Sequence, residues 1–301
     1  MCDETTEAEN SLWATGRTLG RREFSLMTSG VAAAMLLPGC ASGTVADKDD
    51  QKDATMEVAS RTVSIETPDG SADAFFVHPV SGSHPAVIMW PDVAGLREAY
   101  RTMGSRLAEA GYAVLVVNQY YRSAPAPILD TMDDWRTEEG RALIDPMREK
   151  LSPAGTTSDA LAFVAWLDKQ AEVDTSRKMG TCGYCMGGPF TLRTSAARPE
   201  RVGALASFHG GGLVTPTDDS PHLLISTMKA AMLIAIAQND DARDPDAKTV
   251  LMDAAKKAGR PAEIEVYPAQ HGWCTIDAPI YDEAQAEKAW SRMLAIFSEY
   301  L

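Results

Sequence analysis

Residues 178–188 read KMGTCGYCMGG, and this stretch decides how the rest of the sequence is interpreted. Its first seven residues are typical of a buried strand, and a helix is expected from about 186 to 197. Cys185 stands at the junction, with a glycine two positions away on each side, as a sharp strand-to-helix turn requires. The pattern predicts a strained nucleophile at Cys185, whose thiolate the start of the helix would favour.

Two other interpretations of this stretch remain open. Cys182 and Cys185 form a C-x-x-C pair, which a thiol–disulfide oxidoreductase could use. With His271 and Cys274 they would also give four ligands for a non-catalytic, zinc-binding envelope protein. The redox motif usually follows an early strand rather than a central one, and a strand residue and a turn residue three positions apart suit zinc poorly. No metal is therefore expected.

Strands and helices alternate around this stretch. Strands are expected at 59–66, 71–78, 85–90, 112–120, 178–184, 203–209, 231–237 and 263–268. Helices are expected at about 97–110, 157–172, 186–197, 246–258 and 282–299, with 122–153 irregular. The repeated strand–helix units predict an α/β fold with a mostly parallel, doubly wound sheet in a single domain, 59–301.

The order of the remaining candidate residues matches that of the α/β-hydrolases, which place nucleophile, acid and histidine in that sequence along the chain. His271 follows the strand at 263–268 and is the candidate base among five histidines. Asp240 and Asp241 follow the strand at 231–237, where the acid that orients the histidine is expected. Asp240 is preferred because it lies where the strand ends, and Asp241 stays open as the alternative.

These motifs resemble the dienelactone hydrolase family, also called carboxymethylenebutenolidase-like, of the α/β-hydrolases. The resemblance covers about 59–301 and rests on these motifs: GYCMGG (183–188), QND (238–240), HGW (271–273), WPDVAGL (90–96) and NQYYR (118–122). It implies a cysteine hydrolase of carboxylic esters or lactones that forms a thioester and needs no cofactor.

The resemblance also implies roles for further residues. The amides of Val93 and Met186 would form the oxyanion hole. Asp92 stands where the family usually has glutamate, one methylene longer, and Arg122 matches an arginine of the family. Both are expected as supporting residues.

The first 58 residues predict a targeting signal and a tether rather than part of the folded domain. Arg21 and Arg22 precede a short apolar run and resemble a twin-arginine signal. The run ends in Leu-Pro-Gly-Cys40, which resembles the lipobox of bacterial lipoproteins. We expect an export signal at 1–39, lipidation at Cys40 and a flexible tether at 40–58. The expected location is the cell envelope or periplasm.

Composition narrows the range of partners. The chain has 301 residues, 45% of them hydrophobic, which is enough for one substantial core. Its formal net charge of -14 repels phosphate backbones, so nucleic acid is not expected as a partner. We expect a small-molecule ester or lactone as substrate, and contact with a membrane only through a lipid at Cys40.

Overall fold

The computed structural model describes residues 6, 8–11, 13 and 55–301, and its centre is one eight-stranded sheet. The strands are β1 (Val58–Thr67), β2 (Gly70–Pro79), β3 (Ala86–Trp90), β4 (Ala113–Val117), β5 (Met179–Tyr184), β6 (Val202–Phe208), β7 (Ala231–Ala237) and β8 (Ala262–Tyr267). All eight were expected from the sequence, and their ends differ from the expected ends by no more than three residues.

The strands lie in the order β1-β2-β4-β3-β5-β6-β7-β8. The β1–β2 and β2–β4 pairs are antiparallel, and all the others are parallel. The chain therefore runs outward in one direction from β3 to β4 and in the other from β5 to β6. In such sheets the crevice beside the carboxyl ends at this reversal is the usual ligand site.

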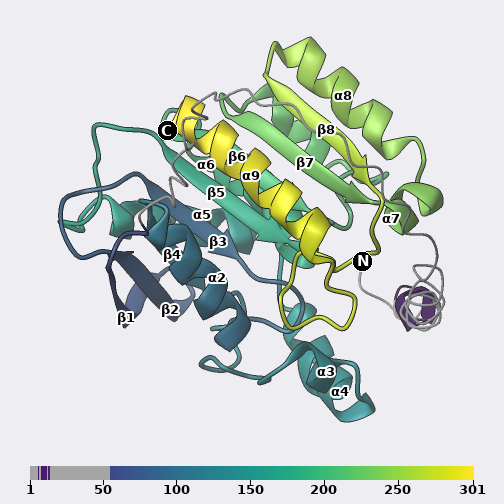
Figure 1. Cartoon of the computed structure of the whole chain (residues 1–301), viewed down its shortest axis with the longest axis horizontal. Coiled ribbons are helices and arrows are strands. Elements are labelled where there is room, and N and C mark those ends of the chain that lie inside the picture. Colours follow the sequence, from purple (N-terminus) through teal and green to yellow (C-terminus); the bar gives the residue numbers. More distant parts are fainter. Residues whose placement is uncertain (1–5, 7, 12, 14–54) are drawn as a thin grey trace, which may run out of the picture.

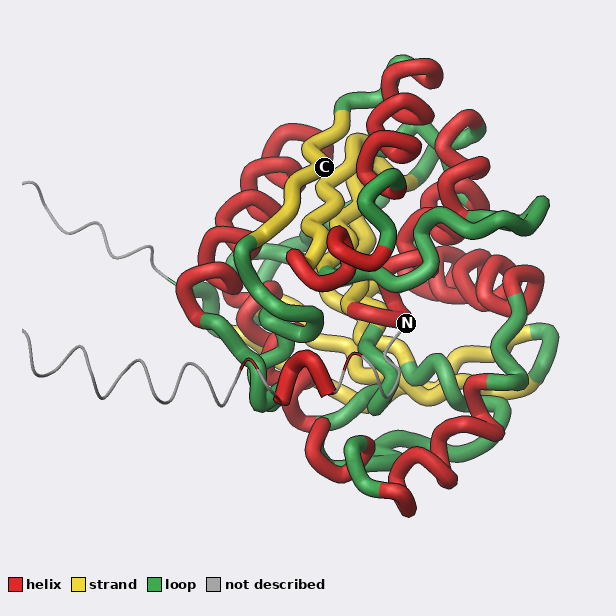
Figure 2. Tube along the Cα trace, turned by 90° about the vertical axis from the view of Figure 1, so that its right-hand side faces the viewer, coloured by secondary structure: helices red, strands yellow, loops and turns green. Residues whose placement is uncertain are grey.

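Helices cover both faces of the sheet, as the sequence predicts (Figures 1 and 2). One face packs against α2 (Glu98–Glu109) and α9 (Glu283–Tyr300). The other packs against α5 (Pro153–Leu167), α6 (Gly188–Ala197) and α8 (Ala247–Ala258). Strands β3, β4 and β5 are buried along their whole length, which explains the continuous apolar runs of β3 and β4.

The segment 122–153 is not irregular throughout, as the sequence suggested. It contains α3 (Met132–Trp135) and α4 (Glu138–Arg148). Thr131 and Asp134 cap the start of α3 reciprocally, and Thr137 caps α4. Met132 and Trp135 of α3 pack with Cys185 in a third hydrophobic cluster, separate from the two faces of the sheet. These short helices therefore form a cap over the crevice.

The predicted signal and tether lie mostly outside the described residues. Arg21, Arg22 and Cys40 are among the positions that the structure does not describe, and Val58, the last residue of the expected tether, begins β1. Residues 6, 8–11 and 13 are helical and are drawn in purple in Figure 1. Within the described residues, no helix has the length and apolar character needed to cross a bilayer.

Candidate active site

Cys185 lies at the turn from β5 to α6, within the 3-10 turn η1 (Cys185–Gly187). Its φ of 52° is in the left-handed region, which a residue with a side chain rarely adopts. A Cβ on Gly183 would lie 2.2 Å from the carbonyl oxygen of Gly187, and one on Gly187 would lie 2.3 Å from that of Trp90. Only glycine fits at both positions, so the motif is dictated by close backbone approach.

His271 reaches this turn from the loop that follows β8. Its Nδ1 lies 2.7 Å from Oδ2 of Asp240, and its side chain also makes a hydrogen bond with Cys185. The backbone N–H of His271 donates to Oδ1 of Asn239 at 2.8 Å, which fixes the loop against α7 (Gln238–Arg243). The structure thus brings three of the expected site residues, Cys185, His271 and Asp240, into one hydrogen-bonded chain.

The charges around His271 favour its protonated form. Burial opposes the charge, but Asp240 and the Cys185 thiolate outweigh it and raise the pKa of His271 to about 10. An imidazole buried between a carboxylate and a thiol is therefore suited to hold the proton that the thiol gives up. This arrangement supports a thiolate–imidazolium pair at rest.

The two candidate acids have different surroundings. Asp240 lies in the first turn of α7 rather than in the expected loop, and it faces His271. Asp241 points to Lys248 instead, with Oδ1 2.6 Å from Nζ. The geometry therefore favours Asp240 over Asp241 as the partner of the histidine.

The loop after β3 places the amide of Val93 beside Cys185. Tyr120 donates its hydroxyl to the carbonyl oxygen of Val93 at 2.9 Å, and Gln119 donates to that of Asp92 at 2.7 Å. The NQYYR segment thus holds this loop in place. Val93 and Met186 line a common cavity with Cys185, and in the described part of the chain neither amide donates a hydrogen bond to another residue. Both amides are thus available to an oxyanion.

Asp92 belongs to a buried charge cluster that sequence reasoning missed. Arg97, with no exposed surface, binds Oδ1 and Oδ2 of Asp92 at 2.8 and 3.1 Å and the carboxylate of Asp277 at 2.7 and 2.8 Å. Burial raises the pKa of Asp92, and Arg97 opposes that shift. Burial also works against the charge of Arg97, but the two carboxylates outweigh it and raise its pKa. The cluster ties the Val93 loop to the loop that carries His271.

Arg122 does not reach the site. Its guanidinium pairs with Asp159 at 2.7 Å and with Asp69 at 2.6 Å. It lines neither of the cavities that Cys185 borders. Arg122 therefore joins the β1–β2 turn to α5 through these two ion pairs and does not contact the cavities where a substrate would bind.

His209 is a second residue that the sequence did not single out for the site. It is buried, adopts a φ of 40°, and its Nδ1 accepts the backbone N–H of Cys185 at 3.1 Å. Burial, and then the charge of His271, lower the pKa of His209 well below its usual value. A neutral ring whose Nδ1 accepts must carry its proton on Nε2. Neutral His209 therefore stabilises the strained turn by accepting the hydrogen bond from the backbone N–H of Cys185.

Two cavities meet at Cys185. The larger, about 620 Å³, also contacts Val93 and Met186. The smaller, about 70 Å³, also contacts His271, His209 and Asp92. Val93 and Met186 thus border one of the two cavities at Cys185, and His271 borders the other.

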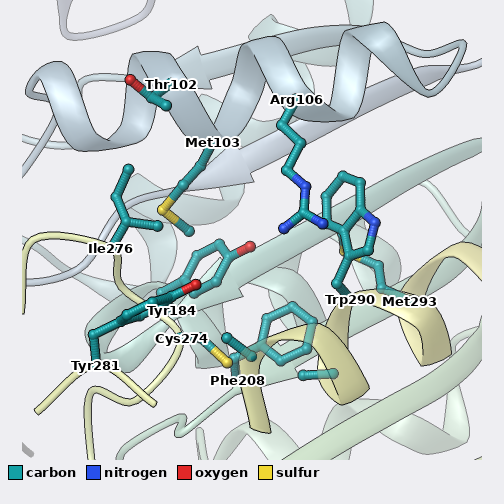
Figure 3. Close-up of a pocket in the computed structure, with 12 residues that line it drawn as sticks. Thr102, Met103, Arg106, Tyr184, Phe208, Cys274, Ile276, Tyr281, Trp290 and Met293 are labelled. Atoms are coloured by element: carbon teal, nitrogen blue, oxygen red, sulfur yellow. The ribbon is translucent and has the colours of Figure 1, made fainter. Parts of the chain in front are cut away.

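Cys182 and Cys274 lie away from these cavities. Figure 3 shows a further pocket of about 80 Å³ between α2 and α9, where Cys274 and Tyr184 contribute to the wall. Cys182 is fully buried in the cluster beneath α2 and α9, and burial raises its pKa. Within the described residues, none of Cys182, Cys185 and Cys274 forms a disulfide. Within the described part of the chain, no three histidine, cysteine or acidic side chains are grouped as a metal site requires.

Comparisons with known proteins bear on the family and the fold of the chain. The model of the dienelactone hydrolase family matches residues 72–301. A candidate carboxymethylenebutenolidase of Salmonella typhi is 28% identical over 251 residues, covering 81% of this chain and 88% of the relative. One from Methylorubrum extorquens is 24% identical over 306 aligned positions, covering 100% and 96%. Among solved structures, a candidate dienelactone hydrolase of Klebsiella pneumoniae has a TM-score of 0.69 at 23% identity, covering 81% of this chain and 100% of that one.

Proposed function

The chain belongs to the dienelactone hydrolase family, whose members are hydrolases of ester and lactone bonds, and we propose that it uses Cys185 as a nucleophile that forms a thioester. One observation carries the proposal. The strained Cys185 shares a hydrogen bond with a buried His271, and Asp240 holds the other ring nitrogen at 2.7 Å. This is the arrangement by which a base activates a nucleophile and a third group orients the base.

In the first half of the reaction the thiolate of Cys185 attacks the carbonyl carbon of the ester. Negative charge then develops on the carbonyl oxygen, and the amides of Val93 and Met186 donate to it. Collapse of the tetrahedral intermediate breaks the bond to the leaving oxygen. The imidazolium of His271 gives that oxygen its proton, and a thioester remains on the cysteine.

In the second half, water attacks the thioester. Neutral His271 takes one proton from the water, and the bond to sulfur breaks. The acid product leaves, and the thiolate–imidazolium pair is restored. No cofactor takes part in either half.

Leaving-group chemistry narrows the substrate class. A thiolate is itself a good leaving group, so the first tetrahedral intermediate returns to reactants unless the alcohol leaves at a competitive rate. Lactones of acidic enols, enol esters and other activated esters meet this condition best. We therefore propose small activated esters or lactones as substrates.

The other two interpretations have less support. A redox pair needs Cys182 to reach Cys185, but Cys182 packs into the cluster beneath α2 and α9 on the far side of the strained turn. A zinc site needs four converging ligands, and Cys274 faces the pocket of Figure 3 instead.

The predicted export signal and lipidation site support a proposal about where the protein is located in the cell. Arg21-Arg22 and Leu-Pro-Gly-Cys40 support export through a twin-arginine signal, processing before Cys40 and attachment to the membrane by lipid at that cysteine. The hydrolase domain would then act in the cell envelope, joined to its anchor by the tether at 40–58.

Steady-state hydrolysis of p-nitrophenyl acetate tests the chemistry. Cys185→Ala and His271→Ala should each lower kcat by several orders of magnitude, as removal of a nucleophile or base does in comparable enzymes. Cys182→Ala is the matched control and should keep most of the activity, since it removes a thiol that contacts no cavity at the site. Equal loss in Cys182→Ala, or retained activity in Cys185→Ala, contradicts the proposal.

A further inference from the structure

The N-terminal segment, described at residues 6, 8–11 and 13, packs against the loop that carries His271. Asn10 donates from Nδ2 to the carbonyl oxygen of His271 at 2.9 Å. Asn10 is 7% exposed and Thr6 is fully buried, although both precede the hydrolase domain by more than forty residues. The contact is therefore with the candidate base itself, through its main chain.

Charged and polar contacts extend this docking to both sides of the site. Glu9 accepts from Asn239 at 3.1 Å and from Arg243 at 2.6 Å, and Asn239 is the residue that holds the backbone of His271. On the opposite side Arg136, at the end of α3, donates to the hydroxyl of Ser11 at 3.0 Å. The segment thus bridges α7 and the helical cap.

This position makes the segment a wall of the catalytic cavity. Asn10 and Ser11 line the small cavity of about 70 Å³ together with Cys185 and His271. The large cavity of about 620 Å³, on the side of Met186, has no contribution from the described residues of the segment. Because His271 donates its proton to the departing oxygen, the small cavity is the side from which the leaving group departs.

We propose that the N-terminal segment is an intramolecular lid that narrows the leaving-group side of the active site and slows the hydrolysis of esters with large leaving groups while it is docked. The identification of that side rests on the proposed thioester mechanism. The volume of about 70 Å³ is less than half of the roughly 150 Å³ of a cavity that binds benzene, so an aromatic leaving group fits poorly there.

The contacts of the lid suit reversible docking. The Glu9–Arg243 pair is partly exposed, at 40% and 29%, so salt weakens it. The Oδ1 of Asn10 is buried without a hydrogen-bond partner in the described part of the chain, which costs free energy in the docked state. Processing before Cys40, as proposed above, would remove the segment altogether. The precursor is then the closed form of the enzyme and the processed chain the open one.

Thiol labelling of the full-length chain tests the lid without relying on catalysis. The protein is purified from cytoplasm, and its intact mass verifies that residues 1–39 are present. The rates at which N-ethylmaleimide and the bulky N-pyrenylmaleimide modify the Cys185 peptide are followed by mass spectrometry. The double variant Glu9→Gln/Asn10→Ala is compared with Ala8→Ser, which alters an exposed position of the same segment.

The double variant should raise the bulky-to-small rate ratio by roughly tenfold, because it removes the hydrogen bond from Asn10 to His271 and the negative charge that pairs with Arg243. Ala8→Ser should leave the ratio unchanged. In parallel, kcat/KM for p-nitrophenyl acetate should rise relative to that for vinyl acetate, whose leaving group is small. Because a maleimide has a second approach to Cys185 from the large cavity, an unchanged labelling ratio together with an unchanged ratio of kcat/KM for the two esters overturns the lid. So does an equal loss of hydrolysis of both esters, which would make the segment part of the catalytic machinery. Failure of the thioester mechanism would be seen separately, as hydrolysis that survives Cys185→Ala.

Discussion

The charge on Asp240 is the feature of the site whose removal has the most definite consequence. Asp240→Asn keeps the size of the side chain and can still accept from Nδ1 of His271, but it removes the charge that stabilises the imidazolium. Two unit charges about 4 Å apart interact by about 4 kcal/mol at an effective dielectric constant of about 20. Asp240 is only 16% exposed, so solvent screens little of this interaction.

A loss of about 4 kcal/mol from the transition state corresponds to about a 10³-fold lower kcat/KM, since each 1.36 kcal/mol is a factor of ten. The pKa of His271 should fall, because Asp240 is the leading group that raises it toward about 10. The imidazolium and its partner thiolate are then less populated at pH 7, and alkylation of Cys185 by iodoacetamide should slow and require higher pH.

The assay compares Asp240→Asn with Asp241→Asn. In the parent chain the carboxylate of Asp241 pairs with Lys248 instead of His271. Hydrolysis of p-nitrophenyl acetate and alkylation of Cys185 are measured from pH 5 to 10 for both variants. Asp241→Asn should stay within about twofold of the parent, since Asp241 pairs with Lys248 and lines neither cavity that Cys185 borders. The reasoning is refuted if Asp240→Asn keeps more than a tenth of the activity, or if Asp241→Asn loses as much.

Three further predictions concern His209, the buried charge cluster and the predicted lipid anchor. His209→Asn should keep far more activity than His209→Phe in the same assay, because the Oδ1 of asparagine can still accept the N–H of Cys185. Equal loss of activity in both variants would show that this hydrogen bond does not support catalysis. Arg97→Met leaves Asp92 and Asp277 without their cation and should lower the free energy of unfolding by about 3–5 kcal/mol in urea titrations at pH 7; a change below about 1 kcal/mol would contradict the structural role of the cluster. Cys40→Ala should release the protein from membranes on cell fractionation, whereas an anchored variant would remove the basis for lipidation.

The parallel sheet could be predicted because its signals are local. Strands such as β3 and β4 are continuous apolar runs, and fully buried strands need such runs. The turn at Cys185 was visible for the same reason, because close approach of neighbouring backbone admits only glycine at two fixed positions. The order of residues along the chain pointed to His271 and to Asp240 or Asp241, and it left the choice between the two aspartates open.

The cap and the charge cluster could not be predicted in this way. The four residues of α3 are too few to show helical periodicity, and Pro146 interrupts the pattern of α4. The reciprocal capping pair Thr131 and Asp134 was the one local signal available. Arg97 binds Asp277, which lies 180 positions further along the chain, so only the folded structure reveals the pair.

The role of His209 depends on the folded structure as well. Its backbone has a positive φ, which residues other than glycine seldom adopt, and nothing in the surrounding strand pattern predicts it. Arg122 illustrates the opposite case. Its match to a family motif suggested a place near the substrate, but two nearby carboxylates bind it elsewhere.

The central claim is that the acyl group of the substrate passes through the sulfur of Cys185. Rapid acid quenching of the enzyme during turnover of p-nitrophenyl acetate, followed by mass spectrometry of the digested protein, tests it most directly. We predict one acetyl group on the peptide that contains Cys185, absent from Cys185→Ala and accumulating in His271→Ala if that variant loses more of its deacylation rate than of its acylation rate. Acetylation of a different residue during turnover, with Cys185 unmodified, would contradict the account.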